Sequence, residues 1–179
     1  MAAERAELAA DVASRFRRDT DWFVASRQSG LYVAQIGTIS ERAVDLLPAL
    51  ALQLDPAVDM VIESLRDRMT WQGRSLALPD VREVVGRLRL PLAMYGGVEI
   101  ALITPDDQLT LTPELSLVVY ARTDRWFFVL EGMGLVERAS PPPVVWSSSR
   151  EKLAPVEDVT SALHAAAERL SLTASPLAS

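Results

Sequence analysis

The stretch GVEIALITPDDQLTLTPELSLVVYARTDRWFFVLE (97–131) carries the most regular pattern in the chain. Short runs rich in Val, Ile, Leu and aromatic residues alternate with turn signals, first Pro-Asp-Asp-Gln and then Pro-Glu. The runs predict four consecutive strands, which fall at 97–104, 109–112, 115–121 and 126–131. Because consecutive strands usually pair antiparallel, the stretch predicts an antiparallel meander at 97–131 in an α+β fold, with helices packed on the sheet.

Amphipathic segments on both sides of the meander supply helices to pack on this sheet. The first of them places Leu8, Val12, Phe16 and Phe23 near one helical face. Pro48 lies inside the second and predicts a kink or a break there. Four helices are expected in all, at 3–27, 41–54, 78–90 and 156–171.

Two further β-rich runs add strands to the expected sheet. One is the run at 31–37, which is bounded by glycines. The other lies at 58–64, and the sequence leaves open whether 58–73 forms a hairpin or a helix. The meander therefore extends into a larger sheet.

Composition divides the chain into a domain and an appendage. We expect an α+β domain at 1–138, a Pro/Ser-rich linker at 139–155, a C-terminal amphipathic helix at 156–171 and a tail at 172–179. Trp146 lies inside the linker, where an exposed indole is costly, so we expect it to pack onto the domain or onto a partner.

Several chemistries are excluded by composition. The chain has no cysteine and a single histidine, His164, which rules out thiol catalysis and sites with several histidine ligands. No catalytic, metal or cofactor motif is present, so a non-enzymatic role is favoured and no cofactor is expected. A net charge of −6 argues against a nucleic-acid partner. No apolar run is long enough to cross a membrane, and a cytoplasmic location is the default expectation.

The last predicted hairpin is apolar on both sides. A four-residue loop at 122–125 would set Tyr120 opposite Phe127 and Val118 opposite Val129. A sheet with one solvated face shows a polar second side, so both faces of this sheet need cover. The cover could be the chain itself, a second copy in a symmetric dimer, or another partner. These four residues and Trp146 are the candidate interface.

Other candidate sites carry weaker signals. Arg122 and Arg125 flank the predicted loop and could clamp an anion such as a phosphate or a carboxylate, as could the basic segment 82–89. Asp106 and Asp107 are typical of a β-turn and are assigned to the turn rather than to a metal. The Gly-Met-Gly at 132–134 lacks the third glycine of a dinucleotide fingerprint, so that function is rejected.

Three hypotheses on function follow. The first is a non-enzymatic interaction or adaptor domain that self-associates through an apolar sheet face. The second is a small-molecule domain, or an enzyme with a weak signature, that binds an anionic ligand. The third comes from the order of the elements in a small acidic chain, which resembles small acidic secretion-chaperone-like α/β sandwiches and implies a chaperone-like protein.

Overall fold

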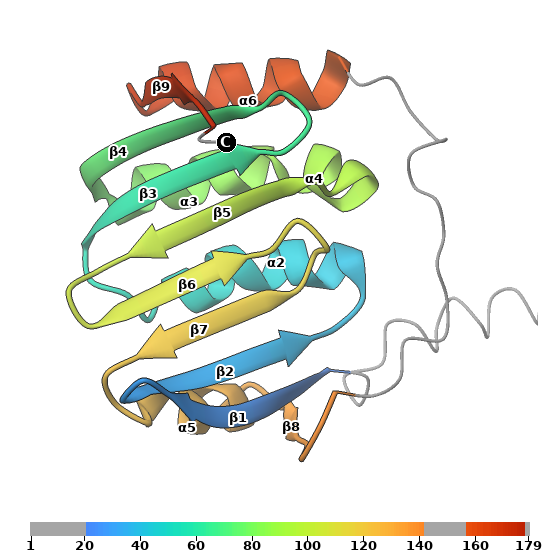
Figure 1. Cartoon of the computed structure of the whole chain (residues 1–179), viewed down its shortest axis with the longest axis vertical. Helices are drawn as coiled ribbons and strands as arrows, with labels where there is room; N and C mark the ends of the chain where they lie inside the picture. Colours follow the sequence, from blue (N-terminus) through green and yellow to red (C-terminus); the bar gives the residue numbers. More distant parts are fainter. Residues whose placement is uncertain (1–20, 142–156, 178–179) are drawn as a thin grey trace, which may run out of the picture.

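The computed structural model describes residues 21–141 and 157–177, which form an α+β fold around one sheet (Figure 1). The nine strands of the described residues lie in the order β8-β1-β2-β7-β6-β5-β3-β4-β9. All neighbours pair antiparallel except β1 and β8, which pair parallel. The strands are β1 (Trp22–Gln28), β2 (Leu31–Gly37), β3 (Ala57–Ser64), β4 (Met69–Ala77), β5 (Val98–Ile103), β6 (Asp107–Leu111), β7 (Leu117–Ala121), β8 (Val136–Glu137) and β9 (Thr173–Pro176).

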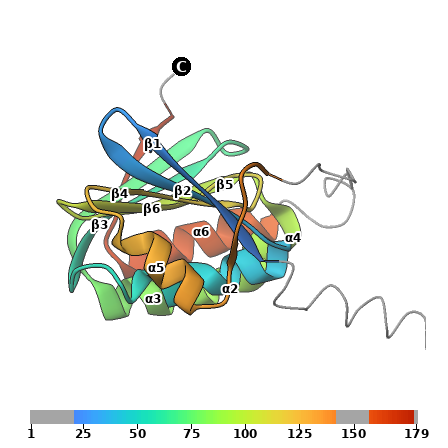
Figure 2. The ribbon, with the colours of Figure 1, turned by 90° about the horizontal axis from the view of Figure 1, so that it is seen from below.

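The described helices all lie on one face of this sheet, as Figure 2 shows. They are α2 (Ser40–Ala51), α3 (Leu78–Arg87), α4 (Arg89–Tyr95), α5 (Arg125–Gly132) and α6 (Glu157–Arg169). None of them has the length and the apolar character that a membrane-spanning helix requires. The fold therefore has two layers, and one side of the sheet faces away from all described helices.

The core lies between these two layers. Strands β5, β6 and β7 each place alternate residues in it, as period-2 alternation requires. The buried residues of these strands on the helix side include Ile100, Leu102, Leu109, Leu111, Leu117 and Val119. Leu47 and Leu50 of α2 are completely buried in the same cluster. Apolar burial of this kind is the main stabilising contribution to the fold.

The fold prediction is confirmed only in part. The fold is α+β, and β5, β6 and β7 pair antiparallel in chain order. The sheet as a whole is mixed and is not a meander, and the expected strand at 126–131 is wrong. Residues 125–132 form α5 instead, in which Trp126 and Leu130 are four residues apart and both buried. The three aromatics raise the strand propensity of this run. Tertiary packing outweighs that propensity, because the i, i+4 pair places two large side chains in the core.

The expected helix at 3–27 is wrong where the structure describes it. Residues 22–28 form β1, while residues 3–20 lie outside the described residues. Phe23 fits the helical spacing of the preceding segment by position alone. Its burial follows a strand pattern, in which Phe23 is fully buried while Trp22 and Val24 are half-buried.

The remaining elements decide between hairpin and helix at 58–73 and show how the prolines at 48 and 91 are accommodated. Residues 58–73 belong to the β3–β4 hairpin. The expected helix at 78–90 is α3, which is followed directly by α4. Pro91 is the third residue of α4, in the first turn, where the missing N–H has no intrahelical acceptor. Helix α2 continues through Pro48, which lies beyond its first turn, so the helix does not break at this proline.

The C-terminal segment joins the same sheet. The expected C-terminal helix is present as α6, which contacts α3 and α4, and β9 pairs with β4. The predicted linker lies mostly outside the described residues, since only 139–141 of it are described. The predicted domain limits stay a prediction.

The edge hairpin contains one close packing contact. Trp22 of β1 lies directly opposite Gly37 of β2, and a Cβ added at Gly37 would overlap the indole of Trp22. An aromatic ring that covers a glycine in this way pins strand register. Gly37 therefore has no room for any side chain.

We predict that Gly37→Ala lowers the free energy of unfolding by about 2 kcal/mol, because the added methyl group must displace the indole of Trp22. Urea denaturation followed by circular dichroism measures the change. The matched control is Gly86→Ala in α3, where a Cβ meets no atom within 4 Å. There alanine should stabilise the protein by about 0.5–1 kcal/mol. An equal effect at the two sites would contradict the packing described.

Candidate functional site

The side of the sheet opposite the helices, which we call the outer face, carries two rows of side chains in register. The first row runs Val24, Gln35, Val118, Thr110, Ala101, Val61, Gln72 and Thr173 from β1 to β9. The second row runs Ser26, Val33, Tyr120, Gln108, Ile103 and Asp59 from β1 to β3. Both rows are centred on or near β6.

The middle of the outer face is apolar at the strands that flank β6. Val118 and Tyr120 of β7 and Ile103 of β5 are half-buried, and Ala101 of β5 is 5% exposed. No described element lies over them, since every described helix packs on the other face. Thr110 and Gln108 of β6 separate the two apolar pairs and are hydrogen-bonded to each other at 3.0 Å. A face of this composition is typical of a surface that another protein layer covers.

A pair of glutamates lies at one end of the outer face. Glu63 of β3 and Glu99 of β5 are directly opposed in register. Burial, followed by repulsion from Glu63 and Glu114, raises the pKa of Glu99 above its usual value of 4.5. Like charges directly opposed on one sheet face are destabilising. Repulsion within this pair therefore lowers the stability of the folded chain at neutral pH.

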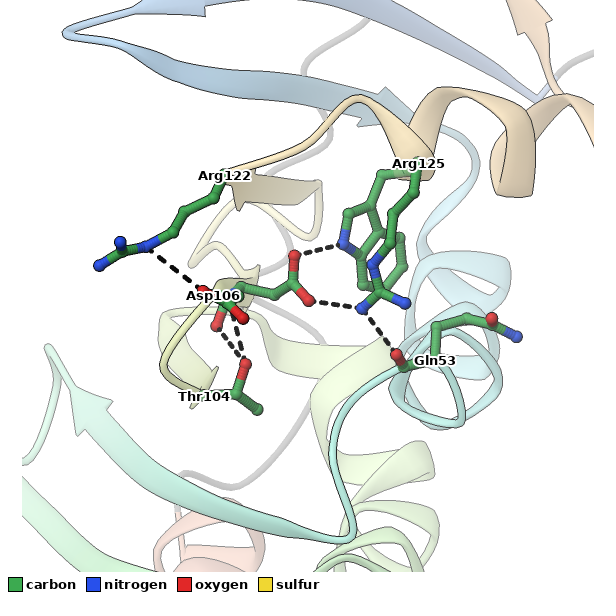
Figure 3. A network of polar contacts seen from close by, with 7 residues as sticks. Gln53, Thr104, Asp106, Arg122 and Arg125 are labelled. Carbon is green, nitrogen blue, oxygen red and sulfur yellow. Dashed lines mark hydrogen bonds and ion pairs between the residues drawn. The ribbon is translucent and has the colours of Figure 1, made fainter.

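The buried carboxylate of Asp107 holds the other polar cluster together, on the helix side of the sheet (Figure 3). Trp126 donates from Nε1 to Asp107 Oδ1 at 2.9 Å, and Arg125 donates to Asp107 Oδ2 at 2.5 Å. Arg125 also donates to the carbonyl oxygen of Gln53, just after α2, at 2.8 Å. A cation at the C-terminal end of a helix is favourable. This network links β6, α5 and the end of α2.

The two candidate anion contacts therefore have acidic partners. Arg125 is held by Asp107, and Arg122 lies 3.5 Å from Asp106 in an exposed ion pair. Asp106 and Asp107 lie at a turn as expected, because Thr104 Oγ1 accepts the backbone N–H of Asp107 at 3.1 Å. The structure places the two arginines on different carboxylates rather than on one shared anion site.

The candidate interface residues divide between the two sides of the sheet. Tyr120 and Val118 lie on the outer face, whereas Phe127 and Val129 belong to α5 under the sheet. The Phe127 ring stacks on Phe23 with a centroid separation of 6.2 Å. Trp146 lies outside the described residues. The proposed pairing of Tyr120 with Phe127 across a hairpin is wrong, because α5 replaces the second strand.

Sequence reasoning missed the β5 contribution to the outer face. Ala101 and Ile103 follow Glu99 at steps of two residues, so strict alternation could have placed them on one side. The run 98–103 is almost continuously apolar and gave no indication of which side faces the helices. Only the pairing of β5 with β6 shows that these residues line up with Thr110 and Gln108.

A small cavity of about 120 Å³ lies between α3 and α6. Its lining is apolar except for Arg87 and Arg169, which both lie against Glu83, at 2.5 and 3.7 Å. The basic segment 82–89 thus contributes one arginine to a cavity edge. His164 lies elsewhere on α6, where its ring meets Trp71 edge-on at 5.4 Å.

No protein-family model, curated protein or solved structure matches this chain. Function must therefore be argued from the geometry of its surfaces.

We predict that Asp107→Asn lowers the free energy of unfolding by about 2 kcal/mol, because it removes a buried charge partner of Arg125. The neighbouring Asp106→Asn is the matched control. Its ion pair with Arg122 is largely exposed, so the change should stay below about 0.5 kcal/mol. Chemical denaturation of both variants measures the difference. Two equal losses would show that Asp107 has no special structural role.

We also predict that Glu99→Gln stabilises the protein at pH 7 by roughly 0.2–1 kcal/mol, since it relieves repulsion from Glu63 and Glu114. A raised pKa means that the folded state binds more protons than the unfolded chain just above pH 4.5. The stability of the unsubstituted protein therefore falls as pH rises through the raised pKa of Glu99. The gain from Glu99→Gln should disappear when the pH falls below 4.5.

Denaturation curves at several pH values test this pH dependence. The exposed Glu131 of α5 supplies the control Glu131→Gln, which should leave the pH profile unchanged. A gain that is the same at every pH would contradict the electrostatic explanation.

Proposed function

We propose that this protein is a non-enzymatic interaction domain that self-associates through the outer face of its sheet. One observation carries the proposal: all described helices cover one face, and the other presents Val118, Tyr120, Ala101 and Ile103 with no described element over them. A sheet face with apolar residues at its centre is stabilised when a second layer excludes water from it.

The size of the outer face fits a stable interface. Nine strands at ~4.8 Å spacing and about 20 Å in length give roughly 800 Å² of flat surface. Specific interfaces of standard size bury about 800 Å² on each partner. The outer face as a whole therefore matches one side of a standard interface.

The two rows of the outer face are self-complementary about β6. A twofold axis parallel to the strands at β6 would bring β7 of one copy over β5 of the other. Val118 would then face Ala101, and Tyr120 would face Ile103. Both contacts are apolar, and the glutamate end would face the part of the second copy that contains Ser116 and Gly37. Two sheets stacked this way keep their strands within about 30°.

A twofold axis across the strands is unfavourable. It would keep each strand over its own copy and exchange the ends of the strands. Glu63 would then face Asp59 of the second copy, since both lie on β3 at opposite ends of the outer face. Like charges brought together in an interface oppose association. The charges therefore favour the axis parallel to the strands.

We predict that light scattering shows a mass that rises from monomer to dimer with concentration. Tyr120→Glu should prevent this rise, because it places a charge in the centre of the interface. Leu90→Glu is the control: Leu90 is 64% exposed on α4, in the helical layer, and its substitution should leave the dimer intact. A protein that stays monomeric up to about 1 mM would contradict the proposal.

A mixing experiment tests the geometry. Tyr120→Glu and Ile103→Lys should each prevent the homodimer, whereas an equimolar mixture should form a heterodimer. In the mixture the introduced acid and base would face one another, and the unchanged Tyr120 and Ile103 would form the second contact. Circular dichroism confirms that each variant is folded. A mixture that stays monomeric would rule out the axis parallel to the strands.

A further inference from the structure

The edge of the sheet at β1 is paired along only part of its length. Strand β8 covers two residues of β1, where Val136 and Arg138 donate their N–H groups to the carbonyl oxygens of Asp21 and Phe23. Pairing alternates, so the N–H and C=O groups of Ala25 and Arg27 also point away from β2. Nothing in the described part of the chain pairs with them. The edge therefore offers two donors and two acceptors in a row.

The chain's own sequence keeps β8 from covering this edge. Donors of β8 recur at every second residue, so 140 and 142 would be next after 136 and 138. Position 142 is a proline, which has no N–H, and residues 141–143 are all prolines. The described chain already bends at 139–140, and Ser140 makes no bond to Ala25. Another segment must therefore supply any continuing strand.

A second copy of β1 fits this edge poorly. Antiparallel pairing of two β1 edges about Ser26 would set the Ser29–Gly30 turn of the second copy opposite Phe23 and Trp22. That position is occupied by β8. An extended peptide without a hairpin turn meets no such obstacle.

The side chains beside the edge define the chemistry of a fitting peptide. On the helix side, Ala25 presents only a methyl group, and Phe127 lies nearby against Phe23 and Tyr32. Two residues further on, exposed Arg27 lies over the Tyr32 ring at 4.6 Å. An added strand alternates its side chains, so one residue could fill the space beside Ala25 and the next on the same side could pair with Arg27.

We propose that the β1 edge at residues 24–28 is a docking site for an extended peptide. The peptide adds a strand beside β1 through the backbone groups of Ala25 and Arg27. It carries a large apolar side chain and an acidic side chain two residues apart, the first beside Ala25 and the second at Arg27. Addition of a strand to an exposed sheet edge is a known mode of peptide recognition. The site is separate from the outer face and goes beyond self-association.

The test uses two fluorescein-labelled peptides, Thr-Phe-Thr-Glu-Thr-Ser and Thr-Glu-Thr-Phe-Thr-Ser. They carry phenylalanine and glutamate in opposite order, so that one of them fits whether the added strand runs parallel or antiparallel to β1. Fluorescence anisotropy with the full chain should show saturable binding of at least one. Methylation of its backbone nitrogens should abolish binding, because the strand then lacks N–H donors. Arg27→Glu should weaken binding about tenfold or more, whereas Arg74→Glu on the exposed part of β4 should not.

A second variant separates loss of the site from loss of the fold. Ala25→Pro removes a donor that points away from β2, so the β1–β2 ladder can persist while peptide binding is lost. Amide resonances of Ala25 and Arg27 should shift on binding, and that of Thr110 on β6 should not. The Tyr120→Glu variant should bind the peptide normally, so this site can stand if self-association fails. The proposal is overturned if neither peptide binds up to about 1 mM, or if N-methylated peptides bind equally well.

Discussion

The position of α5 depends on one buried carboxylate. Asp107 lies on β6, the central strand of the sheet, and receives hydrogen bonds from both Arg125 and Trp126 at the start of the helix. A buried carboxylate is tolerated only with such partners, so the pairing fixes where α5 begins. Once α5 is fixed there, Phe127 reaches Phe23 and Tyr32 and closes the helical layer beneath β1 and β2. In this position α5 lies on the same face of the sheet as the other described helices.

Because the described helices cover only one face of the sheet, the two faces of each strand differ in composition and in burial. On the helix side the strands carry Leu, Ile and Phe that are almost completely buried. On the outer face valine, isoleucine and tyrosine alternate with threonine and glutamine, and most remain half-buried. A fully solvated sheet face is usually polar, whereas this one has Val118, Tyr120 and Ile103 at its centre. A permanent core is usually apolar, whereas Gln108 lies at the centre of this face. The outer face is therefore intermediate in composition between the buried side of the sheet and a fully polar surface.

The sequence predicts the centre of the sheet well and its ends poorly. Strict alternation in 109–112 and the proline turns of 105–116 identify β5, β6 and β7, because the signals there are local. The run at 126–131 has the composition of a strand, and its helical state depends on Asp107, which is nearly twenty residues away. No local sequence pattern predicts the contact between Trp126 and Asp107. The same holds for β1, whose Phe23 matches the helical spacing of the preceding segment by coincidence.

The candidate site was predictable to a similar degree. Tyr120 and Val118 were identified through their expected pairing with Phe127 and Val129, which is wrong. They nevertheless share one face of β7, because they are two residues apart in a strand. Their partners on β5 depend on the pairing of β5 with β6, which composition does not encode. Arg122 and Arg125 appear equivalent in the sequence, yet one pairs with exposed Asp106 and the other with buried Asp107. Asp107 is the first residue of β6 and is buried on the helix side, whereas Asp106 lies in the turn before the strand and is exposed. This difference separates the two arginines.

The proposed dimer contact on the outer face would leave the proposed peptide site at the β1 edge accessible. Stacking about β6 covers a face and leaves the edges of both sheets open to the side. β1 lies three strands from β6, so the two β1 edges of a dimer would be about 30 Å apart in projection. A partner with two suitable extended segments could then bind both edges, and its second contact would form at high effective concentration. Weak strand addition at each edge would in this way become stable binding, which links self-association to an adaptor role.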